Sequence, residues 1–170
     1  MTSPRSPMRW LHAVPAACLL GLAGHAIAQH AAHSHGTARL EVAVDRNAIA
    51  VRLEVPLHDL VGFERAPRTQ AERQRLAQVG EALRQAERMF AFDPDGDCRA
   101  GEVTIDTPGH ADLIAEFTFA CSHGDRAKHV ELGLFEAFPG IRIVNAKVAS
   151  PHGQYRRAIR QSRPRLAWAG

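Results

Sequence analysis

Short runs of alternating apolar and polar residues constrain the fold of this chain more than any other sequence feature. Residues 37–45 and 48–55 are apolar at every second position, which is the period of a strand with one buried face. Arg46 and Asn47 between them can turn the chain, so the two runs predict an antiparallel hairpin. Further strands, separated by glycine and proline turn signals, are expected over 102–107, 112–121, 128–134, 141–149, 155–159 and 166–168.

One segment has a helical period instead. From Leu76 to Phe90 apolar residues recur three and four positions apart, opposite a face rich in arginine and glutamate. Thr69, followed three residues later by Glu72, forms a capping box at the start, so we predict a helix over 70–90. The fold class predicted is α+β, a mainly antiparallel β-sheet with one long amphipathic helix packed across it.

The first 28 residues have the features of a secretory signal peptide. Arg5 and Arg9 precede an apolar stretch, and Ala26-Ile27-Ala28 offers a small-x-small cleavage pattern. We expect cleavage near Ala28 and a periplasmic protein with no transmembrane segment after cleavage, because no second long apolar stretch follows. The mature chain is expected to consist of a flexible histidine-containing tail over 29–36 and one antiparallel α+β domain over 37–170.

Charge and motifs exclude several function classes. The chain has 21 Lys and Arg against 18 Asp and Glu, a net charge of +3, which gives no general reason to expect nucleic-acid binding. It contains no HExxH, GxSxG or P-loop pattern, so we predict that it is not an enzyme. The dense arginine run over 156–165 is interpreted as a solvated strand face rather than a patch for lipid or a partner.

Two cysteines, Cys98 and Cys121, follow the expected cleavage site. In an oxidising compartment such a pair forms a structural disulfide, whose loop closure stabilises by about 3 kcal/mol. A thiolate metal site or a redox pair is the alternative, and the absence of CxxC spacing disfavours both.

A set of short segments occurs in a recognisable order. It comprises His33-Ser34-His35-Gly36, Val61-Gly62-Phe63-Glu64 with Pro67, Cys98, His110-Ala111-Asp112, Phe117-Thr118-Phe119-Ala120-Cys121, Leu134-Phe135, Phe138-Pro139 and Gly153-Gln154. In this order the segments resemble the ZrgA-type periplasmic zinc-uptake family, formerly a domain of unknown function. The resemblance implies a zinc-binding protein that assists zinc acquisition. Family members typically carry a long His/Asp-rich insertion before the segment that matches His110, where this chain has only Thr107-Pro108-Gly109.

Eight of the ten histidines follow Ala28, and some of them are grouped. His33 and His35 are two positions apart, so in an extended tail their side chains point the same way. His110 and Asp112 have the same spacing at the start of a strand. The predicted metal ligands are therefore His33, His35, His110 and Asp112, with His30, His123 and His129 as weaker candidates. His58 and His152 are interpreted as surface or hydrogen-bonding residues.

The ligand types favour one metal. Imidazole and carboxylate suit Zn(II), whereas Cu(I) prefers thiolates and thioethers; Cu(II) and Ni(II) also accept this ligand set. We therefore predict a zinc-binding accessory protein that binds Zn(II) reversibly and assists its uptake by an inner-membrane metal transporter. The alternative is a metal-independent envelope protein-interaction module on the same fold.

Overall fold

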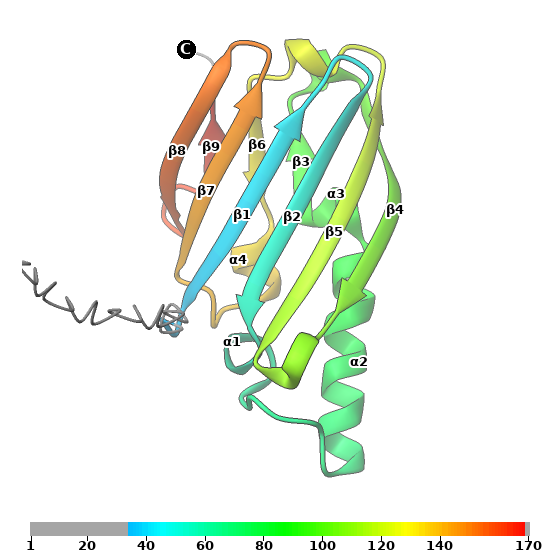
Figure 1. The fold of residues 1–170 in the computed structure, drawn as a ribbon, viewed down its shortest axis with the longest axis vertical. Coiled ribbons are helices and arrows are strands. Elements are labelled where there is room, and N and C mark those ends of the chain that lie inside the picture. Colours follow the sequence, from blue (N-terminus) through cyan, green and yellow to red (C-terminus); the bar gives the residue numbers. More distant parts are fainter. Residues whose placement is uncertain (1–33, 169–170) are drawn as a thin grey trace, which may run out of the picture. The chain divides into compact units, whose positions relative to one another are not determined.

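A six-stranded sheet with the order β4-β5-β2-β1-β7-β8 faces the viewer in Figure 1, which shows a computed structural model that describes residues 34–168. Neighbouring strands are antiparallel except β1 and β7, which are parallel. The strands are β1 (Thr37–Val44), β2 (Ala48–Pro56), β4 (Cys98–Asp106), β5 (Asp112–Cys121), β7 (Ile143–Ser150) and β8 (Gly153–Arg160).

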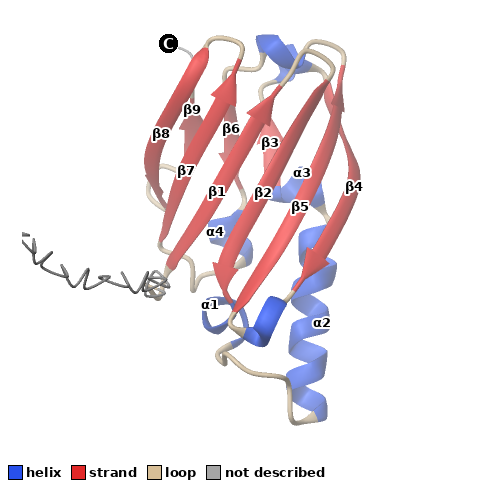
Figure 2. Cartoon of the chain, in the orientation of Figure 1, coloured by secondary structure: helices blue, strands red, loops and turns tan. Residues whose placement is uncertain are grey.

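The second layer covers the back of this sheet (Figure 2). It contains a three-stranded sheet of β3 (Phe90–Phe92), β6 (His129–Leu132) and β9 (Arg165–Ala167). The helices are α1 (Leu57–Val61), α2 (Gln70–Arg84), α3 (Ala86–Met89) and α4 (Leu134–Ala137), with 3-10 turns η1 (Pro94–Gly96), η2 (Pro108–His110) and η3 (Gly124–Arg126). The predicted α+β class, mainly β, is confirmed.

Alternation along the strands separates the two faces of the large sheet. Leu40 and Val42 of β1 lie opposite Leu53 and Val51 of β2, and all four side chains are buried. The residues between them, such as Glu41, face the other way and are exposed. The face behind the sheet therefore carries the core, and the face toward the viewer meets solvent.

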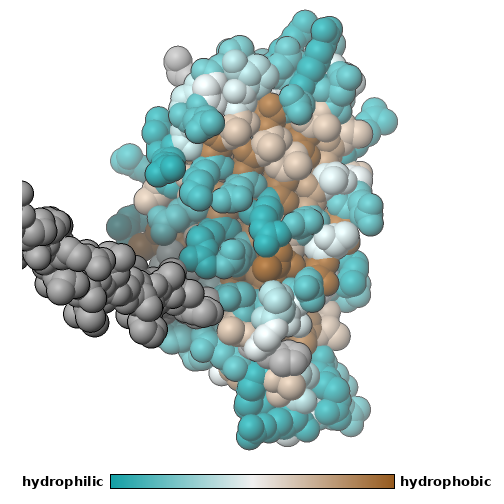
Figure 3. Space-filling model, viewed as in Figure 1, coloured by the Kyte–Doolittle hydropathy of each residue, from teal (hydrophilic) through white to brown (hydrophobic). Residues whose placement is uncertain are grey.

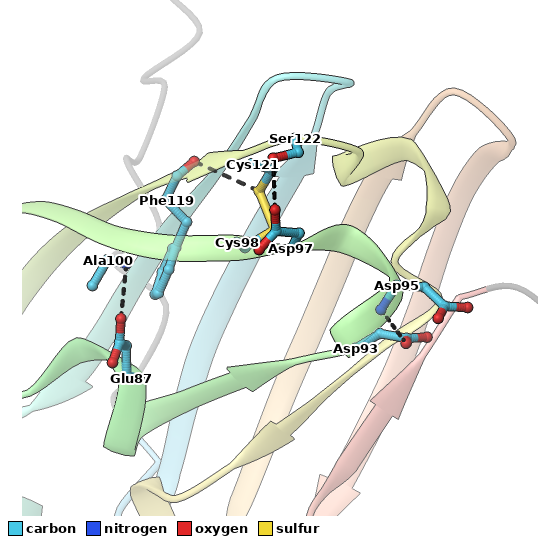
Figure 4. Close-up of a disulfide and its surroundings, with 9 residues drawn as sticks. All are labelled: Glu87, Asp93, Asp95, Asp97, Cys98, Ala100, Phe119, Cys121 and Ser122. Atoms are coloured by element: carbon cyan, nitrogen blue, oxygen red, sulfur yellow. Dashed lines mark hydrogen bonds between the residues drawn. A yellow bond between two sulfur atoms is a disulfide. The ribbon is translucent and has the colours of Figure 1, made fainter.

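The core is anchored where β5 meets the second layer. Phe117 and Phe119 of β5 contact Phe90 of β3 edge to face, with ring centroids 4.9 and 6.5 Å apart. Near the end of the same strand, Cys121 forms the predicted disulfide with Cys98 of β4 (Figure 4). The link ties an edge strand of the large sheet to its neighbour.

The helix predicted over 70–90 is confirmed over Gln70–Arg84, but it does not continue as one helix to residue 90. The capping box of Thr69 and Glu72 is present and starts α2, but α2 ends at Arg84. Gln85 has non-helical dihedrals (φ −82°, ψ 61°), and only the short α3 follows it. Phe90 begins β3, where it pairs with Leu132, because burial against β5 outweighs the local helical period.

Other strand boundaries also differ from the prediction. The strand expected over 128–134 ends at Leu132, and Leu134 starts α4. The strand expected over 102–107 starts earlier, at Cys98, and contains a bulge between Ala100 and Val103. Within the described residues, no helix is long and apolar enough to cross a membrane. The predicted signal peptide lies outside the described residues.

Candidate metal centre

Three strands of the large sheet bring their ends together at its lower edge in Figure 1: β1 and β5 start there, and β2 ends there. Pro56 closes β2 and begins α1, whose residues Leu57 and Val61 are buried beneath the sheet edge. Gly62, in the left-handed conformation (φ 86°), ends α1 after only five residues. The short helix thereby places His58 and Asp59 beside the chain that enters β1.

His35, His58 and Asp59 form a compact group. One ligand atom from each lies within 4.8 Å of the others. The Nδ1 atoms of His35 and His58 are 3.9 and 3.7 Å from Asp59 Oδ1, and the two imidazole rings are 4.6 Å apart. The Asp59 side chain is 5% exposed, whereas the two histidine side chains are 57% and 51% exposed. A buried carboxylate thus faces two solvent-accessible imidazoles.

The turn before β1 fixes this arrangement. The Gly36 N–H donates a 2.6 Å hydrogen bond to Asp59 Oδ2, leaving Oδ1 toward the histidines. The Gly36 carbonyl accepts hydrogen bonds from the backbone N–H groups of Arg142 and Ile143, and Arg142 Nη2 donates to the His35 carbonyl. Gly36 has a φ of 79°, and a Cβ there would lie 2.4 Å from Arg142 Nε. The positive φ therefore favours glycine, and any side chain at this position would also have to displace the Arg142 side chain.

The chemistry of the group suits a divalent ion. Zinc bonds of about 2.0–2.1 Å in a tetrahedron put neighbouring ligand atoms about 3.3 Å apart. The two His–Asp distances of 3.9 and 3.7 Å need only a small contraction, and the whole group, within 4.8 Å, needs the exposed imidazoles to move closer together. Glu64 Oε1 lies 3.8 Å from His35 Nδ1 and adds a second carboxylate beside the group. Three protein ligands leave a fourth position open, as in sites that exchange a ligand. The described residues contain no second such group.

Some of the predicted ligands lie at the end of the sheet where β1 and β5 start, and others lie elsewhere. His35 lies in the group, and the structure adds two residues: Asp59, and His58, which the sequence analysis interpreted as a surface or hydrogen-bonding residue. His30 and His33 lie outside the described residues. Asp112 lies at the same sheet edge, opposite Pro56 in the β2–β5 register, and is not a member of the group. His110 ends η2, and its side chain is not described.

His123 and His129 lie toward the other end of β5. His123 follows Cys121 and precedes η3, ten residues of strand away from the edge that carries His35. His129 Nδ1 lies 3.1 Å from Asp93 Oδ2. Burial opposes ionisation of Asp93, but hydrogen bonds from the N–H groups of Asp95 and Lys128, together with His129, hold its pKa below the usual value. His129 therefore has a carboxylate partner remote from the metal centre.

Comparison with known proteins agrees with this picture. A family model described as "ZrgA family zinc uptake protein" matches residues 32–168, a range that contains all of the described residues. The chain belongs to this family, and its function class is therefore zinc uptake. The matched range includes His35, His58, Asp59 and Glu64. A search of curated proteins finds no match.

Proposed function

We propose that this protein is a periplasmic accessory that binds Zn(II) reversibly at His35, His58 and Asp59 and hands it to an inner-membrane metal transporter. The observation that carries the proposal is the approach of two imidazoles and one carboxylate to within 4.8 Å in a member of a zinc-uptake family. Zinc is the cargo of this protein rather than a resident cofactor.

The contrast in exposure within the group supports exchange. Asp59 is nearly buried and held by the Gly36 N–H, so it supplies a fixed anchor. His35 and His58 are more than half exposed and can reach an ion in solution. One rigid and two accessible ligands favour capture and release over the closed four-ligand shell of a structural zinc site. Glu64 contributes negative charge next to His35.

Further predicted ligands remain part of the proposal. His33 is two residues before His35, and His110 and Asp112 belong to the strand start at the same sheet edge. Across β2, adjacent strands are about 4.8 Å apart, so β5 begins about 10 Å from β1. A ligand from the start of β5 would complete the open position only if its segment moves toward α1. Single alanine variants of His33 and His110 measure that contribution.

Zinc titration of the mature, tag-free protein tests the proposal. We expect binding of one Zn(II) tighter than about 1 mM, weakened at least about tenfold in His35→Ala and in Asp59→Asn. His152→Ala is the matched control, because this exposed histidine contacts the Asp125 carbonyl far from the site. Binding should weaken from about pH 7.5 to about pH 5.5, since protonated imidazole cannot ligate.

Two outcomes contradict the proposal. Wild-type protein that fails to bind zinc below about 1 mM would favour the metal-independent interaction module instead. Equal losses in His152→Ala and His35→Ala would show that the histidines act without a defined site. The delivery step is tested separately: a strain lacking the gene should grow poorly under zinc limitation and be rescued by the wild-type gene, but not by Asp59→Asn.

A further inference from the structure

Strand β8 forms one edge of the large sheet. It is last in the strand order, and its only neighbour in that sheet is β7. The described residues show one further pairing of β8, a single bridge between Arg160 and Arg163 where the chain turns toward β9. An edge strand presents backbone N–H and C=O groups that no other strand pairs, so an extended chain can add to it.

The backbone of β8 can be reached from outside the sheet. Tyr155 and Ile159 are the only residues of β8 that are not exposed. Arg157 Nη1 donates a 2.9 Å hydrogen bond to the Arg156 carbonyl, so a side chain already reaches this backbone acceptor. In the space-filling view of Figure 3, hydrophilic side chains project on the side of the molecule where Figure 1 places β8.

The last part of the sequence, which includes β8, has a charge of one sign. Residues 34–136 contain 12 Lys and Arg against 18 Asp and Glu, whereas residues 137–170 contain no acidic residue. The seven basic residues of this last part are Arg142, Lys147, Arg156, Arg157, Arg160, Arg163 and Arg165. Such a segregated charge attracts a partner of the opposite sign.

The arginines of β8 lack acidic partners within the protein. Arg156 lies opposite Lys147, and the acidic residue on the other side of Lys147 is Glu41, whose Oε1 is 3.1 Å from Lys147 Nζ. Arg156, Arg157 and Arg160 form no ion pair within the part of the chain that the structure describes. Their charge is therefore available to an acidic partner.

These arginines project from both faces of the sheet, because successive side chains of a strand alternate. Arg156, opposite the exposed Lys147, lies on the solvent-facing side, whereas Arg157, opposite the buried Ala146, lies on the side of the core. A lipid surface would meet one of these faces only. A strand added in the plane of the sheet meets both, so the arrangement favours an extended peptide over a membrane.

We propose that β8 binds an extended acidic segment of another protein, which adds to the large sheet as an antiparallel strand. Opposite charges at directly opposed positions stabilise a pair of strands. The segment should therefore carry two consecutive acidic residues opposite Arg157 and Arg156, one for each face. The alternative role of these arginines is to protect an open edge from pairing, which predicts no acidic ligand.

The docked segment would lie at the side of the sheet that leads to the metal centre. Ile143, opposite Arg160 at the end of β8, donates a hydrogen bond from its N–H to the Gly36 carbonyl, next to His35. Only β7 separates β8 from β1, a distance of about 10 Å between the two strands. Delivery of zinc to this partner rests on the proposed function. Docking does not, because no residue of the metal centre belongs to β8.

Calorimetry of the mature, zinc-free protein with a synthetic peptide tests the docking surface. The probe is a peptide of alternating threonine and valine with blocked ends and two consecutive glutamates at its centre. We expect saturable binding tighter than about 1 mM, weakened at least about tenfold in Arg156→Glu/Arg157→Glu. This variant should instead bind the matching peptide with two lysines, which wild type should not bind.

The control variant is Arg46→Glu/Arg99→Glu. It changes the net charge by the same amount, but Arg46 lies in the β1–β2 turn and Arg99 in β4, the opposite edge strand. Both residues are exposed, and neither forms an ion pair within the described residues. The control should bind the glutamate peptide nearly as well as wild type.

Two measurements test strand addition separately from charge. A peptide with the same glutamates and proline at alternate positions cannot donate the ladder hydrogen bonds and should not bind. Hydrogen exchange of the β8 amides should slow when the glutamate peptide is bound.

Four results would overturn the inference. They are no peptide binding below about 1 mM, equal losses in the two double variants, equal binding of the proline peptide, or binding of anionic lipid vesicles without binding of the peptide. Asp59→Asn separates this inference from the proposed function. Peptide binding preserved in that variant, with zinc binding lost, supports a docking surface distinct from the metal centre. Absence of zinc binding in wild type, with the peptide bound, would overturn the proposed function alone.

Discussion

Replacement of Gly36 with alanine tests whether the turn before β1 holds the proposed zinc site in place. Gly36 has a φ of 79°, a conformation that costs an L-residue about 1–2 kcal/mol. The new Cβ would lie 2.4 Å from Arg142 Nε, so the Arg142 side chain must move. That movement breaks its hydrogen bond to the His35 carbonyl, worth about 0.5–1.5 kcal/mol. Gly36→Ala should therefore lower the free energy of unfolding by about 2–3 kcal/mol.

The same substitution should weaken zinc binding. Straining the turn disturbs the hydrogen bond from Gly36 N–H to Asp59 Oδ2 and the position of His35. Loss of groups that orient metal ligands typically costs about 10- to 100-fold in affinity. We expect a change of this size by calorimetry, with stability measured by urea unfolding of the zinc-free protein.

Gly153→Ala is the matched control. Gly153 also has a positive φ (133°), but it lies at the start of β8, and an added Cβ would meet only Tyr155 at ordinary contact distance. This variant should lose stability and keep the wild-type affinity for zinc. The reasoning is refuted if Gly36→Ala binds zinc as tightly as wild type, or if both variants lose affinity equally.

The remaining predictions concern stability. Reduction of Cys98–Cys121 should lower the free energy of unfolding by about 3 kcal/mol, seen as a shift of the urea midpoint; an unchanged midpoint would contradict this. Thr69→Ala removes the cap of α2 and should cost about 1 kcal/mol by thermal unfolding, and no change would show that the cap is unimportant. Because the folded pKa of Asp93 is below its ordinary 3.8, ionised Asp93 stabilises the fold above that pH. This contribution is lost as the pH falls below about 4. Asp93→Asn should be less stable at neutral pH and show a flatter acid limb, and an unaltered pH profile would contradict the assignment.

Local patterns were sufficient for much of the fold. The alternation over 37–55 predicted the β1–β2 hairpin, and the run over 112–121 matches β5 in full. Thr69 and Glu72 identified the start of α2, because a capping box involves only neighbouring residues. These features depend on short-range periodicity and hydrogen bonding, which are visible in the sequence.

Features set by distant segments were not predictable in this way. Phe90 belongs to the helical stripe by spacing, yet its pairing with Leu132 and its contact with Phe117 place it in β3. The parallel pairing of β1 with β7 joins segments about a hundred residues apart, and no local pattern encodes it. That pairing also places Arg142 against the turn at Gly36.

Of the three residues of the proposed zinc site, the sequence analysis identified only His35. His35 stood out because of its neighbour His33, but His58 is an isolated histidine in a helix of five residues, too short to show a period. The predicted hairpin did, however, contain information about which residues lie near His35. Residues just before its first strand and just after its second strand must lie at one edge of the sheet, which brings His35 toward His58 and Asp59.

A crystal structure of the zinc-loaded protein, with anomalous diffraction at the zinc edge, tests the central claim most directly. We predict one zinc peak with an imidazole nitrogen of His35, an imidazole nitrogen of His58 and a carboxylate oxygen of Asp59, each about 2.0–2.2 Å away. A zinc peak bound instead by His123 or His129, or no peak near Asp59 at saturating zinc, would contradict the account.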